Sequence, residues 1–245
     1  MSIPKVIHYC WFGHNPLPPL AKRCIASWRK FFPDYEIKEW NEDSFDVNSI
    51  PYTAQAYKHK KYAFVSDYAR FKILYENGGI YFDTDVEVIK PMNDILEKGA
   101  FFGLEDNPYT FACAPGLGFA CHPKMNLLKD MLSLYEGLTF VTPSGELNKK
   151  TIVEHFTEML LSQGLQPKAG IIEFRGAYIY PPDYFCPKPS EFGKIQITEN
   201  TRTIHHYAGS WISPKQRFAN LLIRIFGKRV IVNLWKFLCR HKQND

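Results

Sequence analysis

The hydrophobic positions near the start of the chain follow two different patterns. Apolar and aromatic residues are dense from Ile3 to Phe12, whereas from Leu20 to Phe32 they recur every three or four positions until Pro33 interrupts them. Tyr35 to Trp40 returns to the first composition. A dense apolar run is typical of a buried strand, and the longer repeat is typical of an amphipathic helix. The pattern therefore predicts a strand, a helix and a strand in succession, which is the start of an α/β sheet.

A longer helix and another strand are expected in the middle of the chain. Tyr62 to Glu76 contains no glycine or proline, and Asn77-Gly78-Gly79 follows it directly. Because glycine readily adopts the left-handed conformation that ends a helix, the helix should stop there and Ile80 to Phe82 should form a short strand. Further strands are expected at residues 86–89, 100–104, 118–121, 171–174 and 203–207, and further helices at 124–135 and 149–162.

The composition is that of an ordinary globular domain. The chain has 245 residues, of which 45% are hydrophobic and 22% are charged, and it is long enough to bury one substantial core. Its six cysteines form no CxxC pair, so we expect reduced thiols in a cytoplasmic protein. A proline, a lysine and a histidine interrupt the first residues, and no stretch has the roughly 20 apolar residues of a membrane span. We therefore expect neither a signal peptide nor a membrane anchor.

Charge separates the end of the chain from the rest. Residues 213–245 hold eight Lys or Arg and one acid, whereas residues 1–212 are close to neutral. Apolar residues recur at helical spacing from Phe218 to Leu238, so this segment should form a basic amphipathic helical tail after a domain at 1–212. Such a tail can lie on an anionic membrane surface, here on the inner face of the cytoplasmic membrane, or pack on the core with its basic face in water. Nucleic-acid binding has little support, because the body lacks a basic and aromatic groove pattern.

Two carboxylates follow the central strand in the string YFDTD. Asp83 and Asp85 are separated by one small polar residue, and hard cations such as Mg²⁺ and Mn²⁺ take carboxylate ligands beside a diphosphate. Taken alone, the string is weak evidence for a metal site, because a turn that carries two solvated acids explains it more readily. On the preceding helix, Ser66, Asp67 and Arg70 lie within one turn and can share a face towards the same cleft, although a surface ion pair would explain them too.

The segment FVSDYARFKILYENGGIYFDTD, residues 64–85, resembles glycosyltransferase family 32, which includes bacterial capsule and O-antigen sugar transferases. It is more distantly similar to the glucosyltransferase domains of large clostridial toxins. The resemblance implies a GT-A-type, Rossmann-like mixed sheet flanked by helices that binds a nucleotide sugar. It also implies that Ser66, Asp67 and Arg70 face the donor ribose and sugar, that Asp83 contacts the same groups and that Asp85 binds the metal.

A second block, IHHYAGSW at residues 204–211, resembles the family's C-terminal string. The resemblance implies that His206 completes the metal site and that Gly209, Ser210 and Trp211 close over the diphosphate, with the Trp211 indole N–H donating to a phosphate oxygen. Adjacent side chains on a strand point to opposite faces, so only one of the two histidines can be a ligand. The resemblance favours His206, and the alternative is one core histidine beside one exposed histidine.

The first strand, IPKVIHYCWFG, is similar to the family's opening strand, whose end holds the nucleotide base. His8, Trp11 and Phe12 are therefore candidates for contacts with the base or ribose, Trp11 by stacking. Packing of these side chains beneath the sheet is the alternative reading.

The resemblance implies a retaining, metal-dependent glycosyltransferase that uses Mn²⁺ or Mg²⁺. Its donor would be UDP-Gal, UDP-Glc or UDP-GalNAc, and its acceptor a glycan, such as a lipid-linked oligosaccharide in capsule or O-antigen synthesis. The expected catalytic residues are Asp67, Arg70, Asp83, Asp85 and Trp211. Two alternatives remain open: a nucleotidyltransferase or nucleotide-diphosphate hydrolase with the same metal site, and a catalytically silent, membrane-associated sugar-binding adaptor.

Overall fold

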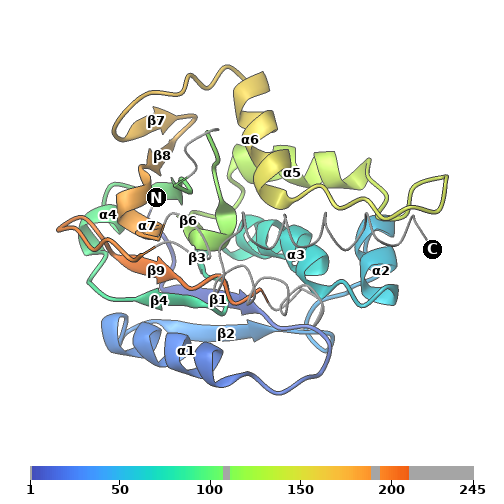
Figure 1. Ribbon diagram of the computed structural model, residues 1–245, viewed down its shortest axis with the longest axis horizontal. Coiled ribbons are helices and arrows are strands. Elements are labelled where there is room, and N and C mark those ends of the chain that lie inside the picture. Colours follow the sequence, from blue (N-terminus) through green and yellow to red (C-terminus); the bar gives the residue numbers. More distant parts are fainter. Residues whose placement is uncertain (1, 107–110, 189–193, 210–245) are drawn as a thin grey trace, which may run out of the picture. The chain divides into compact units, whose positions relative to one another are not determined.

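The computed structural model describes residues 2–106, 111–188 and 194–209. The chain divides into two compact units, Met1–Ala208 and Gly209–Asp245, and the elements below belong to the first. Figure 1 shows them in the order β1 (Val6–Cys10), α1 (Pro19–Phe31), β2 (Glu36–Trp40), α2 (Pro51–Lys58), α3 (Tyr62–Asn77), β3 (Gly79–Tyr81), β4 (Val86–Val88), α4 (Asn93–Leu96), β5 (Ala100–Gly103), η1 (Pro115–Leu117), β6 (Phe119–Cys121), α5 (Asn126–Glu136), α6 (Ile152–Ser162), β7 (Ile172–Phe174), β8 (Ala177–Tyr180), α7 (Pro182–Phe185) and β9 (Thr203–His205). The boundary predicted between residues 212 and 213 and the predicted tail lie outside the described residues.

Seven of the strands form one mixed sheet in the order β2-β1-β3-β6-β5-β8-β7. Strand β1 is parallel to both β2 and β3, and β5 is parallel to β8. The pairs β3-β6, β5-β6 and β7-β8 are antiparallel. Strands β4 and β9 form a separate antiparallel pair. The predicted α/β class, with a mixed sheet flanked by helices, is confirmed.

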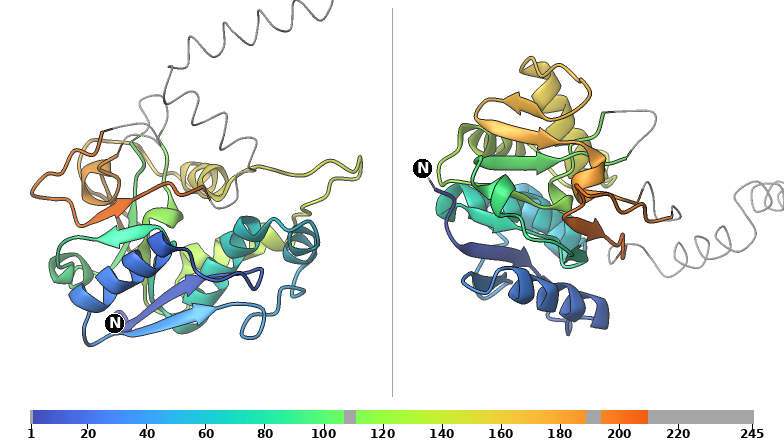
Figure 2. Two further views of the ribbon diagram at one scale, coloured as in Figure 1. Left: turned by 60° about the horizontal axis from the view of Figure 1, so that its bottom comes forward. Right: turned by 90° about the vertical axis from the view of Figure 1, so that its left-hand side faces the viewer.

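The two faces of the large sheet are buried under different helices. Alternate side chains of a strand point to opposite faces, and here Ile80 packs with Trp28 of α1 while Tyr81 packs with the α3 side. Phe101 and Phe102 of β5 divide in the same way. Figures 1 and 2 show α1 on one side of the sheet and α3, α5 and α6 on the other. Burial on both faces explains why the sequences of β3 and β5 are nearly continuous apolar runs.

Helix α1 fixes the position of β4, the strand that follows the string YFDTD at residues 81–85, which we call the acidic string. The indole N–H of Trp28 donates a 2.7 Å hydrogen bond to the Val86 carbonyl oxygen. The Ser27 hydroxyl oxygen accepts one from the Val88 N–H at 2.9 Å. Trp28 is fully buried, so this end of β4 is tied to the core on the α1 side.

The glycine pair after α3 allows the chain to turn directly into the sheet. Gly78 and Gly79 have φ values of 65° and 96°, which side chains rarely tolerate. A Cβ at Gly79 would lie 2.6 Å from the Val6 carbonyl oxygen, so only glycine fits beside β1. His8 of β1 completes the junction, since its Nε2 lies 3.1 Å from the Gly78 carbonyl oxygen. The predicted helix stop is confirmed, and it brings α3 and the acidic string together.

Several elements were not predicted from the pattern. Helix α2 has only eight residues and no long apolar repeat. Strand β8 follows β7 through Arg175 and Gly176, whose φ values of 47° and 81° are those of a type I′ hairpin turn. That pair, between two apolar runs, was a usable hairpin signal. The five described cysteines are free and buried, as expected of reduced thiols. Among the helices that the structure describes, none is long and apolar enough to cross a membrane.

The buried imidazole of His8 should make stability depend on pH. Burial lowers its pKa from 6.5 to about 4, against the smaller raising effect of its bond to Gly78. The unfolded chain therefore binds the proton more readily between these values, and the free energy of unfolding should fall by about 3 kcal/mol as pH drops from 6.5 to 4. Urea unfolding of wild type and His8→Gln across this range measures the effect, with the exposed His59→Gln as control. Equal pH slopes in wild type and His8→Gln would contradict it.

Candidate active site

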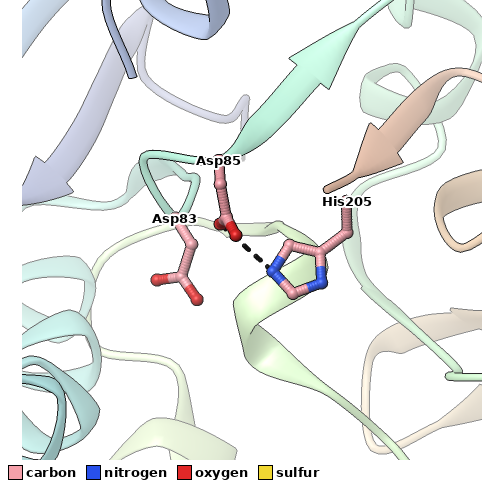
Figure 3. A group of neighbouring side chains, drawn as sticks. All are labelled: Asp83, Asp85 and His205. Carbon is pink, nitrogen blue, oxygen red and sulfur yellow. Dashed lines mark ion pairs between the residues drawn. The ribbon is translucent and has the colours of Figure 1, made fainter. Parts of the chain in front are cut away.

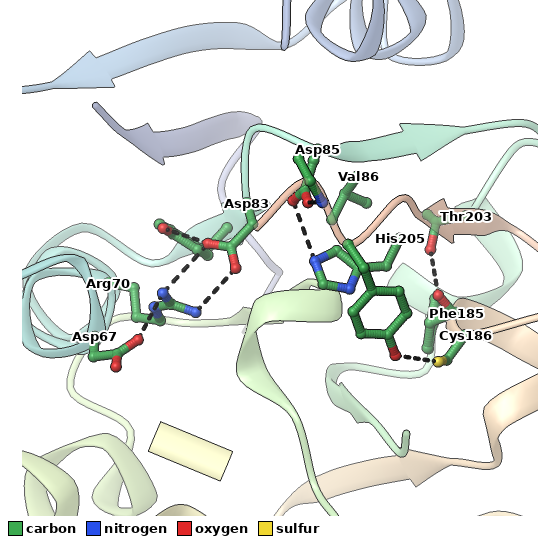
Figure 4. Close-up of polar contacts among 12 residues, drawn as sticks. Asp67, Arg70, Asp83, Asp85, Val86, Phe185, Cys186, Thr203 and His205 are labelled. Atoms are coloured by element: carbon green, nitrogen blue, oxygen red, sulfur yellow. Dashed lines mark hydrogen bonds and ion pairs between the residues drawn. The ribbon is translucent and has the colours of Figure 1, made fainter. Parts of the chain in front are cut away.

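A buried arginine joins α3 to the acidic string (Figure 4). The Arg70 Nη2 lies 2.9 Å from Asp67 Oδ1 and 3.3 Å from Asp83 Oδ1, and only 4% of its side chain is exposed. Its Nε donates to the Ser66 carbonyl oxygen at 3.1 Å. A surface ion pair is therefore excluded as the reason for these residues. The guanidinium is held rigidly between two carboxylates from different elements.

Asp83 is enclosed on several sides. The Tyr81 hydroxyl donates to its Oδ1 at 3.0 Å, and Arg70 lies on the same side. Gly116 of η1 lies so close that a Cβ there would sit 2.5 Å from Asp83 Oδ2. Burial raises the pKa of Asp83, although Arg70 acts to lower it. Burial likewise raises the pKa of Asp67 to about 7, again against Arg70.

Asp85 meets a histidine from the far end of the described chain (Figure 3). Antiparallel pairing of β4 with β9 places Val86 opposite His205. His205 Nε2 lies 3.2 Å from Asp85 Oδ1, and the Ala208 N–H donates to Oδ2 at 2.7 Å. Burial alone would raise the pKa of Asp85, but the attraction of His205 and these hydrogen bonds lower it to about 2. The carboxylate is therefore charged at neutral pH.

Asp83, Asp85 and His205 offer ligand atoms that lie within 4.8 Å of one another. Two carboxylates and an imidazole are a suitable set for a divalent ion such as Mn²⁺ or Mg²⁺. His205 Nδ1 is buried and has no hydrogen-bond partner among the described residues, so this ring carries a polar atom that the protein itself leaves unsatisfied. The nitrogen that faces the carboxylates is Nε2 (Figure 3), so it is the donor set of Asp83, Asp85 and His205, rather than Nδ1, that fits a metal centre.

The structure brings His205 to Asp85, whereas the resemblance favours His206. His206 Nε2 instead lies 2.7 Å from Glu87 Oε2. Strict alternation along β4 and β9 would place Asp85 and His206 on one face. However, the Val86 N–H bonds to the Asp83 carbonyl oxygen, and the turn formed there takes Asp85 out of the pleat. The Asp85 carboxylate can then be reached by His205 instead of His206.

The residues expected to contact the nucleotide base or ribose differ in their burial and in their contacts within the protein. His8 is 1% exposed, and its Nδ1 accepts a 3.0 Å hydrogen bond from Trp40 Nε1. With Nε2 bonded to the Gly78 carbonyl, both ring nitrogens are occupied within the protein. Phe12 is buried against Phe45, which matches the packing alternative stated for it. Trp11 is partly exposed and its indole N–H donates to the Asn15 carbonyl oxygen at 2.6 Å, so its ring remains a candidate for stacking.

The remaining candidates are divided between the helix and the second unit. The Ser66 hydroxyl donates to the Tyr62 carbonyl oxygen at 3.2 Å, within α3. Ser210 and Trp211 lie outside the described residues, and Gly209 begins the second unit. Sequence reasoning missed Tyr81 and Gly116. Tyr81 had a signal, because it precedes Asp83 by two residues, and residues two apart in an extended chain share a face.

The comparison with protein families matches the part of the chain that contains the buried arginine and the acidic string. Residues 18–102 match the family described as glycosyltransferase sugar-binding region containing DXD motif. The match includes Asp67, Arg70, Asp83 and Asp85. His205 lies outside the matched residues, so it is the fold of the chain that brings this histidine to Asp85.

The chain is also similar to individual proteins. An uncharacterized glycosyltransferase, L373, of Acanthamoeba polyphaga mimivirus is 33% identical over 106 residues, which cover 41% of this chain and 42% of that protein. Inositol phosphoceramide mannosyltransferase 1 of Schizosaccharomyces pombe is 30% identical over 116 residues, which cover 41% of this chain and 33% of that protein. The structure of PaToxG glycosyltransferase aligns with a TM-score of 0.49 and 21% identity, over 66% of this chain and 70% of that one.

These matches cover less than half the length of the two curated relatives. The matched family and the two relatives are all described by name as glycosyltransferases or mannosyltransferases. Residues 18–102 of the chain are therefore similar to the glycosyltransferase sugar-binding region containing a DXD motif, in agreement with the resemblance of residues 64–85 to family 32.

Proposed function

We propose that the protein is a metal-dependent glycosyltransferase that moves a hexose from a nucleotide sugar to a glycan acceptor. The observation that carries the proposal is the meeting of Asp85 with His205 beside the cluster of buried Asp67 and Arg70 with the partly exposed Asp83. This arrangement lies within a chain whose residues 18–102 match the DXD-containing sugar-binding region. Charged ligands for a cation and buried groups for sugar hydroxyls thus occur side by side.

The side chains divide into two roles. Asp85 and His205, with Asp83 at the edge, would hold Mn²⁺ or Mg²⁺. When bound, the ion supplies positive charge that stabilises the departing diphosphate. Asp67 and Arg70 fix the donor sugar through its hydroxyls, and Asp83 contacts the ribose and sugar. Trp211 remains the candidate donor of a hydrogen bond to a phosphate oxygen.

We further propose that the anomeric configuration is retained. The carboxylates of Asp67 and Asp83 are both engaged with Arg70, so neither is a good covalent nucleophile. The acceptor oxygen would instead attack on the face that the diphosphate leaves. The new carbon–oxygen bond forms as the bond to the diphosphate oxygen breaks, and the acceptor's proton passes to that phosphate oxygen.

The donor and acceptor need direct measurement. UDP-Gal, UDP-Glc and UDP-GalNAc are the donors that the family resemblance suggests, while the name of the fission yeast relative adds mannose and an inositol phosphoceramide acceptor. A lipid-linked acceptor in capsule or O-antigen synthesis, reached from the cytoplasmic side through the tail at 213–245, completes the proposal. A thermal-shift screen of UDP-, GDP- and CDP-sugars with and without Mn²⁺ would identify the base. Stabilisation by one nucleotide only with metal is the expected result.

Two other activities would use the same residues. A nucleotidyltransferase would release pyrophosphate, a nucleotide-diphosphate hydrolase would need no acceptor, and a glycosyltransferase releases the nucleoside diphosphate only when sugar moves. A silent adaptor would bind the nucleotide without turnover. Product analysis with and without acceptor separates all of them.

Neutralising Asp85 should abolish transfer. Asp85→Asn keeps the shape but removes the charge that His205 pairs with, so the rate should fall at least ~1,000-fold, because several kcal/mol of charge stabilisation are lost. Release of the nucleoside diphosphate in the presence of acceptor is the measurement. A turnover close to wild type would sink the assignment of Asp85.

The two adjacent histidines provide a matched test of the metal site. His205→Gln should weaken Mn²⁺ binding at least ~100-fold, because loss of groups that merely orient a metal ligand already costs 10- to 100-fold. His206→Gln should change it little, since His206 pairs with Glu87. Calorimetric titration of both variants with Mn²⁺ measures the difference. The reverse order of effects would restore His206 as the ligand.

Gly116 should be essential for the position of Asp83. The new methyl group of Gly116→Ala would lie 2.5 Å from Asp83 Oδ2, so the carboxylate must rotate away from Arg70. Transfer should fall by about 100-fold, as expected for a misplacement of about 1 Å. Gly137→Ala is the control, since the nearest atom to its new Cβ is 3.5 Å away. Unchanged transfer in Gly116→Ala with an unchanged melting temperature would contradict the role of Asp83.

A further inference from the structure

The outer face of α1 carries a group of cations that the proposed reaction does not use. Lys22, Arg23, Arg29 and Lys30 are all exposed, and the exposed Ala26 lies between them. At about 100° per residue, these five positions fall within roughly one third of the helix circumference. The opposite face buries Ala21, Cys24, Ile25 and Trp28 against the sheet, so the orientation of the helix is fixed. We call the five exposed residues the α1 basic face.

Among the described residues, no carboxylate forms an ion pair with the cations of this face. The sequence holds no Asp or Glu from Gly13 to Pro33. The nearest acid along the chain, Asp34, follows the end of the helix. The charge of the α1 basic face is therefore presented to the surroundings.

The stability of the helix accounts for the positions of only two of the four cations. Arg29 and Lys30 lie in the last turn, where a positive charge is stabilised by the helix dipole. Lys22 and Arg23 lie near the start, where the dipole disfavours positive charge, and the first turn contains no acid to offset it. Helix stability explains the first pair but not the second. A negatively charged partner explains all four.

The rim of the face is partly apolar. Leu17, Leu20 and Phe31 are partly buried at the edge of the core beneath α1, and Lys30 Nζ lies 5.1 Å from the centre of the Phe31 ring. A basic helix face bordered by partly exposed apolar side chains suits the boundary between lipid headgroups and acyl chains. A single convex helix offers no groove for a nucleic-acid strand and no stacking platform.

We propose that the α1 basic face docks the protein on an anionic lipid surface. This surface belongs to the first unit, whereas the predicted tail at 213–245 lies outside the described residues. The inner side of the same helix bonds to β4 through Trp28 and Ser27. Docking through α1 therefore holds β4, the strand that follows the acidic string, in one orientation to the lipid surface. The inference goes beyond the proposed reaction, and its test does not require turnover.

Vesicle sedimentation of the full chain tests the proposal. The vesicles contain phosphatidylcholine alone or with about 30% phosphatidylserine, which gives an anionic surface. One variant replaces Lys22, Arg23, Arg29 and Lys30 with Gln. The matched control replaces Lys58, Lys98, Lys129 and Lys168, four exposed lysines elsewhere in the first unit, with Gln. Both variants lose the same net charge and keep the tail. Equal melting temperatures show that both are folded.

Wild type and control should sediment with the anionic vesicles, and the α1 variant should partition at least ~10-fold more weakly at low salt, with the difference shrinking as salt rises. Equal losses in the two variants would mean that only net charge matters and would overturn the proposal. Binding by the α1 variant that equals wild type would overturn it in favour of the tail. No binding of wild type to anionic vesicles would also overturn it and leave an acidic protein as the partner of this face.

Discussion

The constraint on which the site depends is the buried guanidinium of Arg70. It lies 2.9 Å from Asp67 and 3.3 Å from Asp83, and a charge so far removed from water is tolerated only where carboxylates are close. Such pairs contribute little to stability, because desolvation costs about as much as the attraction returns. The cluster is therefore better explained by what it binds than by what it stabilises.

The rest of the fold brings distant parts of the chain to this cluster. The glycine pair after α3 turns the chain into β3, so that the acidic string emerges beside the helix that carries Arg70. Helix α1 then ties β4 to the core through Trp28. Strand β9, more than 100 residues later, pairs with β4 and delivers His205. Each of these contacts has a packing function, and together they converge on Asp83 and Asp85.

The sequence predicts those parts of the structure that depend on local preferences. The period of α1, the uninterrupted run of α3 and the stop at Gly78 all follow from residue types alone. The cluster of Asp67 and Arg70 is also predicted, because residues three apart on a helix are neighbours. These elements required no knowledge of the tertiary structure.

What the sequence does not predict depends on contacts between distant segments. The choice between His205 and His206 depends on a turn before β4 that takes Asp85 out of the regular alternation. His8 has the residue type of a ligand contact, yet its nitrogens are both occupied by Trp40 and the Gly78 carbonyl. Gly116 is a turn residue by composition, and its role beside Asp83 appears only when η1 folds against the string. Side-chain direction at a strand end and partner identity in the core are tertiary properties.

The two acids of the string are held in different electrostatic environments although one residue separates them. Burial raises the pKa of Asp83, whose oxygens are already bound by Arg70 and the Tyr81 hydroxyl. The pKa of Asp85 falls to about 2, because His205 and the Ala208 N–H outweigh the effect of burial. A carboxylate that keeps its charge is suited to hold a cation, and one fixed by a guanidinium is suited to orient hydroxyl groups. The spacing of the string therefore matters because it places one carboxylate at the start of a turn and the other within it, each with its own partner.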